Sequence, residues 1–400
     1  MKPIRVLAFT PIPEEGAGAR FRLYQYIPAL EASGFKVTVQ PFFTDHFFRI
    51  IYRTGLGGLK IKFFIKQTLA RMQQLLHRTE YDVFLVYREA FPIGPPLIEF
   101  VLSRTGGRPL IYDFDDAIYL PNASDVNQFI GVLKYPQKVP AIIRTSTHVI
   151  AGNPNLADYA RMHNEWVSMI PTCVDTTRFA PLPQHRGAGR SLLRVGWIGS
   201  HSTVKYLRSL LPVLTQVARQ HPFLLYVVGS PTPLRADGLT IVQAPWELVR
   251  EIADFQSCDI GVYPMWNDVW AQGKCGFKAI QFMACGVPVV ASAVGVNREI
   301  IQDGVNGFLA ETHDEWTRKL IRLLSDRELC QQFAEAGRRT VEERYALAVN
   351  APKMIAVLRG AIRRIRDQSP AITADLSSPG TSAPGEPSIP RGRGSHRETP

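Results

Sequence analysis

The stretch GKCGFKAIQFMACGVPVVAS, residues 273–292, decides the fold. Two glycines at its start predict a loop, and the apolar segment that follows has the length of about two helical turns. Gly286 ends this helix, and residues 288–291 have the composition of a buried strand. A loop, a helix and a strand in this order form one unit of a parallel sheet.

The start of this predicted helix is suited to a phosphate. The first N–H groups of a helix have no partner within the helix, and here Lys274 and Lys278 lie beside them. The alternative is an ordinary helix–strand unit without a ligand.

Short apolar runs alternate with longer amphipathic segments along most of the chain, which predicts parallel sheets covered by helices on both faces. The predicted strands are Ile4–Phe9, Lys36–Gln40, Val83–Val86, Leu110–Tyr112, Val149–Ala151, Val167–Ile170, Leu193–Ile198, Phe223–Val228, Thr240–Val242, Ile260–Tyr263, Val287–Ala291 and Phe308–Leu309. The predicted helices include Ala19–Ser33, Val204–Gln220, Asp314–Leu324 and Arg327–Tyr345.

This alternation starts afresh near Leu193, after a segment rich in Pro, Thr, Gly and Arg over residues 171–190. We therefore expect two doubly wound, Rossmann-like α/β domains that face a central cleft. The predicted limits are residues 1–185 for the first domain, 186–345 for the second, 346–366 for a terminal helix that packs back on the first domain, and 367–400 for a disordered tail of Ser, Pro, Gly and Thr.

A net charge of +11 and a pI near 9.5 indicate an anionic partner, which leaves nucleic acid, an anionic membrane or a phosphorylated small molecule. No zinc-finger, RNP or basic-zipper pattern is present, so we do not expect nucleic acid. The five cysteines form no CxxC pair, and no apolar run is long enough for a membrane span. We expect a cytoplasmic protein, with contact at the inner face of the membrane left open.

A second corner of the phosphate-binding kind lies at residues 199–205. A predicted strand ends at Gly199, a polar turn begins with Ser200, and Lys205 lies in the first turn of the next helix. A solvated lysine is the alternative, but two such corners in one domain favour anion binding.

These two corners belong to an ordered set of segments. In order along the chain, the set comprises residues 199–205, 228–229, 259–264, 276–277, 283–290, 297–300 and 303–308, preceded by 170–179. Together they resemble the donor-binding half of the GT-B glycosyltransferases of family 4, the glycosyl transferases group 1. The similarity covers roughly residues 3–365 and is strongest over 193–310, and the loop Gly-Lys-Cys-Gly-Phe-Lys at 273–278 is similar to that of a subgroup with its own version of the site.

The resemblance implies a retaining transfer from a nucleotide diphosphate sugar to a hydroxyl acceptor, with no obligatory metal or other cofactor, in envelope polysaccharide or glycolipid synthesis. It implies that the second domain holds the donor and the first the acceptor. Carried over residue by residue, the charged catalytic side chains are Lys205, Lys274 and Lys278, and the donor-binding residues are Gly199, Ser200, Gly229, Gly273, Cys275, Gly276, Phe277 and Gln281.

The chain departs from the family pattern at three positions. Family members usually have two glutamates, for the donor sugar and the ribose, where this sequence has Gly273 and Gln281, and an arginine where it has Ser200. A glutamine amide can still hydrogen-bond a ribose hydroxyl. The alternatives are a non-catalytic protein that binds sugar nucleotides, and a nucleotide-sugar 2-epimerase, which would need acidic and histidine acid/base groups in the cleft.

Two loops of the first half are candidates for the acceptor side or for cleft structure. They contribute Gly16, Gly18, Arg20 and Arg22 after the first strand, and Asp113, Asp115 and Asp116 after the strand Leu110–Tyr112. The arginines could clamp a phosphate or be solvated, and the Asp-x-Asp pattern raises a magnesium alternative, although we expect no metal site. His148 and His201 are the histidines expected nearest the cleft, and Trp246 is either a core residue or a neighbour of the nucleotide base.

Residues 42–78 form a candidate membrane contact. Between residues 46 and 79 there are seven Lys/Arg and no acidic residue. One helical face collects apolar residues, with polar ones away from it: Ile61, Phe64, Ile65, Leu69, Met72 and Leu76 against Lys62, Lys66, Gln73 and His77. The alternative is a helix whose apolar face packs on its own sheet.

Overall fold

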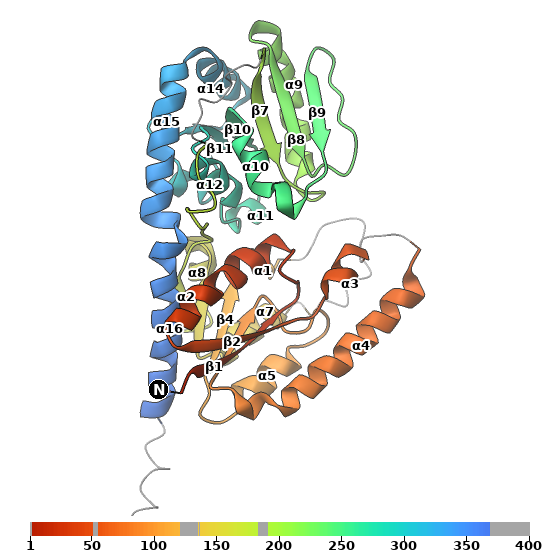
Figure 1. Cartoon of the computed structure of the whole chain (residues 1–400), viewed down its shortest axis with the longest axis vertical. Helices are drawn as coiled ribbons and strands as arrows, with labels where there is room; N and C mark the ends of the chain where they lie inside the picture. The colour runs from red at the N-terminus through yellow and green to blue at the C-terminus, as the bar shows by residue number, and fades with distance from the viewer. Residues whose placement is uncertain (1, 51–54, 121–134, 136, 183–190, 369–400) are drawn as a thin grey trace, which may run out of the picture.

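Two six-stranded parallel sheets organise the chain (Figure 1), in a computed structural model that describes residues 2–50, 55–120, 135, 137–182 and 191–368. The first sheet has the order β2-β1-β3-β4-β5-β6 and the second β12-β11-β10-β7-β8-β9. The strands are β1 Ile4–Thr10, β2 Phe35–Pro41, β3 Val83–Tyr87, β4 Leu110–Phe114, β5 His148–Ala151, β6 Val167–Met169, β7 Leu193–Ile198, β8 Phe223–Val228, β9 Thr240–Ala244, β10 Ile260–Tyr263, β11 Val289–Ser292 and β12 Phe308–Ala310. Each predicted strand is present, with ends within two residues of the prediction.

Helices connect and cover these strands. In the first half they are α1 Ala17–Arg22, η1 Tyr24–Tyr26, α2 Ile27–Ala32, α3 Asp45–Ile50, α4 Gly57–Leu76, η2 Arg78–Glu80, α5 Leu97–Ser103, α7 Lys138–Thr145 and α8 Pro154–Arg161. In the second half they are α9 Val204–Gln220, η3 Leu248–Arg250, α10 Glu251–Gln256, α11 Val269–Gln272, α12 Phe277–Ala284, α13 Asn297–Ile300, α14 His313–Ser325, α15 Arg327–Thr340, η4 Val341–Tyr345 and α16 Leu347–Asp367.

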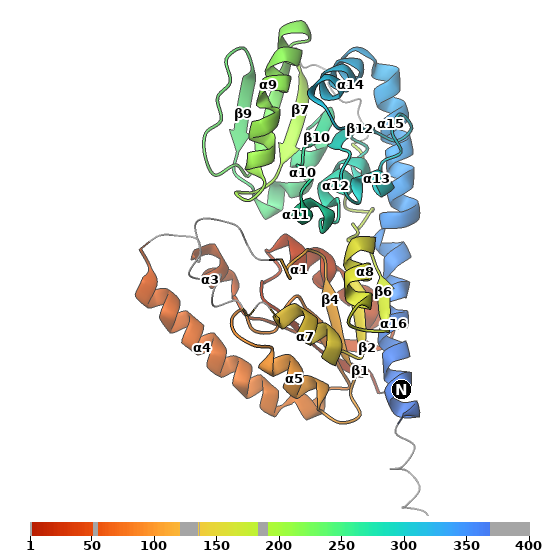
Figure 2. The same cartoon turned by 180° about the vertical axis from the view of Figure 1, so that it is seen from behind.

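Both faces of each sheet are buried, which explains why the strands are almost continuously apolar. Helices α5, α7 and α8 cover one face of the first sheet, and α2 with α16 covers the other (Figure 2). In the second half, α9 and α14 pack on one face and α10 with α12 on the opposite one. The single predicted helix Ala19–Ser33 is divided into α1, η1 and α2, because Pro28 lies at the start of α2 and has no N–H to donate.

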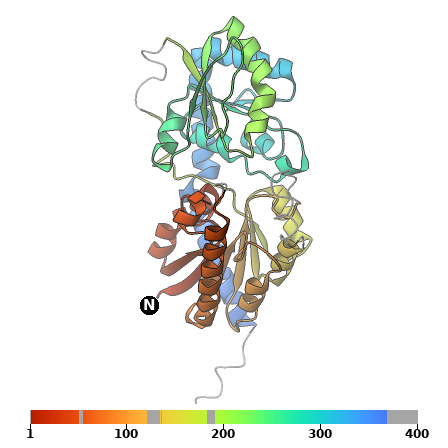
Figure 3. The ribbon, with the colours of Figure 1, turned by 90° about the vertical axis from the view of Figure 1, so that its right-hand side faces the viewer.

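One column of helix spans both halves (Figures 1 and 3). Helix α15 packs on the second half, η4 is a π-helical turn, and α16 continues on to the first sheet, where Met354 and Leu358 join its core. Helix α16 therefore packs on the first half. The residue limits assigned to the domains stay a prediction, and the proposed disordered tail and part of the linker lie outside the described residues.

The strand order of each sheet reverses at one place, between β1 and β3 in the first and between β7 and β10 in the second. Ligands of doubly wound sheets bind beyond the carboxyl ends of the strands at such a reversal. The chain segments that leave these strand ends from the two sheets meet between the halves, and the site described below is built from them.

Candidate active site

A cavity of about 160 Å³ lies between the two halves. The first half lines it with Ala17, Gly18, Arg88, Asp115, Asp116 and Thr172, and the second with Tyr263, Lys274, Cys275, Phe277 and Lys278. The structure therefore brings together seven residues that the sequence singled out, and they come from both halves of the chain: Gly18, Asp115, Asp116, Lys274, Cys275, Phe277 and Lys278.

The loop before α12 is fixed against the first half. The Lys274 ammonium forms an ion pair of 2.7 Å with Asp116, and the Cys275 thiol donates to the Asp115 carbonyl at 3.1 Å. At Gly273 a Cβ would lie 2.3 Å from that of Ala117. In this arrangement position 273 has no room for a side chain, so the glutamate of the family pattern cannot be accommodated there.

Gly276 gives the loop its shape. Its φ of +62° lies in the left-handed region, and a Cβ here would lie 2.2 Å from the Cδ1 of Ile300. This turn places the start of α12 at the cavity, with the Phe277 ring 4.5 Å from the ring of Phe21. The first N–H groups of α12 and Lys278 in its first turn thus face the same region, as the sequence predicts.

Lys278 is a cation of the site whose pKa is lowered. Its ammonium donates to the Gln281 side-chain oxygen at 2.8 Å. Burial lowers the pKa of Lys278 to about 8, Glu251 opposes this shift, and Arg20 adds to it. The Gln281 amide is fully buried and does not line the cavity, and its nitrogen has no hydrogen-bond partner among the described residues.

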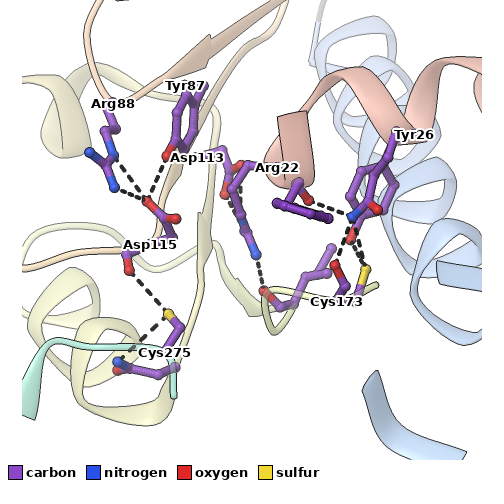
Figure 4. A network of polar contacts seen from close by, with 12 residues as sticks. Arg22, Tyr26, Tyr87, Arg88, Asp113, Asp115, Cys173 and Cys275 are labelled. Atoms are coloured by element: carbon purple, nitrogen blue, oxygen red, sulfur yellow. Dashed lines mark hydrogen bonds and ion pairs between the residues drawn. The ribbon is translucent and has the colours of Figure 1, made fainter. Parts of the chain in front are cut away.

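Arg88 was missed by the sequence analysis, although it follows β3 directly and thus lies at the same sheet edge as Asp115. Its guanidinium donates to the Asp115 carboxylate at 2.7 and 3.0 Å, and the Tyr87 hydroxyl donates to it at 2.8 Å (Figure 4). Burial would raise the pKa of Asp115, but the charges of Arg88 and Arg22 and these hydrogen bonds hold it below its usual value. Arg88 has a φ of +60°, the one positive value outside glycine among the described residues, and such strain is concentrated at functional sites.

Asp113 and Arg22 are buried and do not line the cavity, which corrects the expectation that all three aspartates reach the cleft. Strand β4 extends two residues further than predicted, because Asp113 and Phe114 pair with β5. Arg22 and Asp113 form a buried ion pair, and Arg22 also donates to the Ile170 carbonyl at 2.6 Å (Figure 4).

The phosphate clamp suggested for Arg20 and Arg22 is not supported, and neither arginine is solvated. Both are buried and bound within the chain, Arg20 through an ion pair of 2.8 Å with Glu251 of the second half. Among the described residues, no three His, Cys, Asp or Glu side chains are grouped so that they could hold a metal ion.

The corner at residues 199–205 belongs to the second half, and none of its residues lines the cavity. Gly229 has a φ of +82°, and its Cβ position lies 2.3 Å from the Gly199 carbonyl, so both residues have to stay small. Trp246 is half-buried beside Gly229, and the Arg20 guanidinium lies 5.6 Å from its ring centre. Ser200 and Lys205 are exposed, with the Lys205 ammonium 5.0 Å from the ring centres of Tyr206 and Trp266.

The remaining predicted residues lie at the edge of the site or outside it. Gly16 precedes α1, and a Cβ there would meet the side chain of Ile12. His148 begins β5, at the opposite edge of the sheet, and contacts Arg364 and Ser168, so the expectation that it lies near the cleft is wrong. His201 is exposed on the turn before α9.

Solved structures resemble this chain over nearly its whole length. The sucrose-phosphate synthase from Thermosynechococcus elongatus matches with a TM-score of 0.64 and 18% identity, over 90% of this chain and 100% of that one. The Anabaena protein HepE in complex with UDP-glucose matches with a TM-score of 0.62 and 16% identity, over 91% and 100%. The chain has the GT-B fold.

Within this GT-B chain, residues 192–326 match the family model described as glycosyl transferases group 1. A D-inositol 3-phosphate glycosyltransferase of Stackebrandtia nassauensis is 29% identical over 236 residues, which make up 52% of each protein. Another, from Salinispora tropica, is 36% identical over 213 residues, 45% of this chain and 41% of the relative. The chain spans about half the length of the curated relatives it matches.

Proposed function

We propose that the protein is a glycosyltransferase that moves a sugar from a nucleoside diphosphate sugar to a hydroxyl acceptor. The observation that carries the proposal is the convergence of Lys274, Lys278 and the start of α12 with Asp115 and Asp116 in one cavity between the halves of a GT-B fold. The similarity of residues 192–326 to glycosyl transferases group 1 and the UDP-glucose held by HepE support the same choice of donor.

Different residues of the site are suited to different parts of the donor and to the acceptor. Lys278 and the N–H groups of α12 are placed to neutralise the departing diphosphate, with Lys274 beside them and Lys205 at the outer edge. The buried Gln281 amide suits a ribose hydroxyl, and Trp246 beside the Gly199 and Gly229 corner suits the base. On the acceptor side, Asp115 and Asp116 have carboxylate oxygens for hydroxyl groups.

Retention of configuration is part of the proposal and follows from the family resemblance. The acceptor hydroxyl then attacks from the face that the diphosphate leaves, and a donor phosphate oxygen takes its proton. This needs positioning and charge stabilisation and no nucleophilic side chain. We also propose a role in envelope polysaccharide or glycolipid synthesis. All five cysteines are free thiols, which supports a location in the reducing cytoplasm.

The decisive experiment offers the purified protein a panel of UDP-, GDP- and TDP-sugars, with and without hydroxyl acceptors, and measures released nucleoside diphosphate. We expect release with at least one donor, and loss of most of it in Lys278→Met at unchanged stability. Binding without release under any condition would show a non-catalytic sugar-nucleotide protein and overturn the proposal. Formation of an epimerised donor would also overturn the proposal. Among the described residues, however, no histidine lines the cavity to act as the acid or base of an epimerase.

A further inference from the structure

The outer face of α4 is apolar and faces solvent. Five side chains one or two turns apart form a single stripe along this helix, and all are exposed: Ile61 by 62%, Ile65 by 54%, Leu69 by 65%, Met72 by 45% and Leu76 by 74%. Residues spaced by three and four along a helix lie on one face. An apolar stripe of this length on a surface indicates a contact with another apolar phase or molecule.

This stripe is not the face that holds α4 on its own half. The inner face carries Phe64, whose ring lies 5.2 Å from that of Phe42 and 5.7 Å from that of Phe91. Leu75 and Arg71 are buried on the same side, the latter with its guanidinium 4.5 Å from the ring centre of Phe9. Of the apolar face predicted from the sequence, Phe64 thus packs on the first half, and the five other residues stay exposed.

Charge indicates what the stripe contacts. Lys62 and Lys66 are exposed beside it, and neither forms an ion pair with any residue that the structure describes. No acidic residue occurs between positions 46 and 79, so nothing in this segment offsets them. An apolar stripe with lysines along its border is complementary to a bilayer that has anionic headgroups above hydrocarbon.

The neighbouring helix α5 also carries exposed apolar side chains. Figures 1 and 2 both show α5 beside the second part of α4, and Arg78 after α4 donates to the Thr105 hydroxyl after α5. On α5, Leu97 is exposed by 66% and Phe100 by 43%. No helix among the described residues is both long and apolar enough to cross a membrane.

We propose that the outer face of α4, continued by α5, binds an anionic membrane surface and presents the cleft to an acceptor held in that membrane. The choice of a membrane-borne acceptor rests on the proposed function, whereas the binding to lipid does not. In both overall views the first turn of α4 is the end of this helix that lies nearer the second half (Figures 1 and 2).

The test is co-sedimentation of the purified full chain with vesicles of phosphatidylcholine, with and without phosphatidylglycerol. We expect binding to the anionic vesicles at least about tenfold stronger than to the neutral ones. The double variant Ile65→Asp and Leu69→Asp should lose at least about tenfold in binding, because it places charge where the stripe enters the leaflet. Lys62→Gln with Lys66→Gln should reduce only the preference for anionic lipid.

The matched control places two aspartates on exposed apolar residues of other surfaces, Met162→Asp and Val249→Asp, and should bind like the unchanged protein. Binding equal in all variants, or equal to both lipids, would overturn the proposal. So would self-association that the α4 variant abolishes, since the face would then join two copies of the chain. Release of nucleoside diphosphate without vesicles should be the same in the α4 variant, and this separates a failed membrane proposal from a failed enzyme proposal.

Discussion

Lys278 lies in the first turn of α12, where its ammonium donates to Gln281, and we have proposed that it binds the donor diphosphate. Burial lowers its pKa to about 8, so its charge changes within an accessible range of pH. As pH rises through this value the ammonium loses its proton and with it the attraction for diphosphate. We therefore expect the donor Michaelis constant to rise about tenfold between pH 7 and pH 9.

The control for this pH dependence is Lys278→Arg, because a guanidinium stays charged across the same range. The Michaelis constant of this variant should change little between pH 7 and pH 9. A rise of the Michaelis constant in both proteins would show that a group other than Lys278 titrates.

Without donor, rising pH should stabilise the folded protein, although it weakens donor binding. The unfolded chain keeps the lysine proton to higher pH, so the free energy of unfolding should increase as pH rises above about 8.

The buried ion pair of Arg22 and Asp113 joins α1 to β4 in the first half, and the two side chains are 0% and 2% exposed. Asp113→Asn leaves the Arg22 charge buried without its carboxylate, which should lower the free energy of unfolding by about 3–5 kcal/mol. Asp158→Asn removes a pair with Arg161 whose side chains are 73% and 54% exposed, and should cost less than about 1 kcal/mol. Denaturant unfolding measures both, and equal effects would contradict the role assigned to the buried pair.

At the scale of the element, the loop before α12 depends on the left-handed backbone of Gly276. Gly276→Ala should cost about 1–2 kcal/mol from the backbone alone, and more because Ile300 has to move. Donor turnover should fall with it, since the start of α12 is displaced. Gly360→Ala is the control, because Gly360 lies in α16 with open space at its Cβ position and should gain up to about 1 kcal/mol. Unchanged turnover in Gly276→Ala would show that donor binding does not depend on the conformation of this loop.

The elements also show what a sequence can reveal. Strands buried on both faces are almost purely apolar, so their positions follow from composition, as for β7 and β8. The end of β4 does not follow from composition, because Asp113 is polar and is held in the sheet by its ion pair with Arg22 of α1. The outward stripe of α4 has the same spacing as a core-facing one, and only the packing of Phe64 on Phe42 decides which face is buried.

The candidate site was predictable to the extent that it follows strand ends and one helix start. Lys274, Cys275 and Lys278 follow from the loop, and Arg88 would have followed from the same rule applied to β3. The pairing of Arg20 with Glu251 joins residues 231 positions apart, and no local pattern contains it.

At the scale of the whole molecule, contacts between the halves keep the cavity small. Besides the contacts of Lys274 and Arg20, the Asn153 amide donates to the Lys274 carbonyl at 3.0 Å and Asn155 to the Gln272 carbonyl at 3.0 Å. The cavity of about 160 Å³ is below the roughly 300 Å³ at which ligand pockets begin. We therefore expect the halves to separate before a nucleotide sugar enters.

A disulfide between the halves tests this opening. A Cβ at Gly152 would lie 2.7 Å from the Cys275 sulfur and 3.0 Å from the Cα of Asp115, so the two positions are adjacent and the Cys275 side chain has to shift to form the bond. Gly152→Cys, once oxidised, should lose most donor turnover and regain it on reduction, because the bond holds the halves together. The unchanged protein given the same oxidant is the control. Full turnover in the oxidised variant would mean that the halves need not part.

The central claim is that the cavity at the start of α12 is the binding site for the donor. Calorimetric titration of UDP, GDP and TDP into the unchanged protein, Lys278→Met and Lys36→Met tests it most directly, since Lys36 is an exposed lysine of the first sheet. The account predicts one site for one of these nucleotides, with equal affinity in the unchanged protein and Lys36→Met and about tenfold or more weaker binding in Lys278→Met. Equal affinity in all three proteins would contradict it.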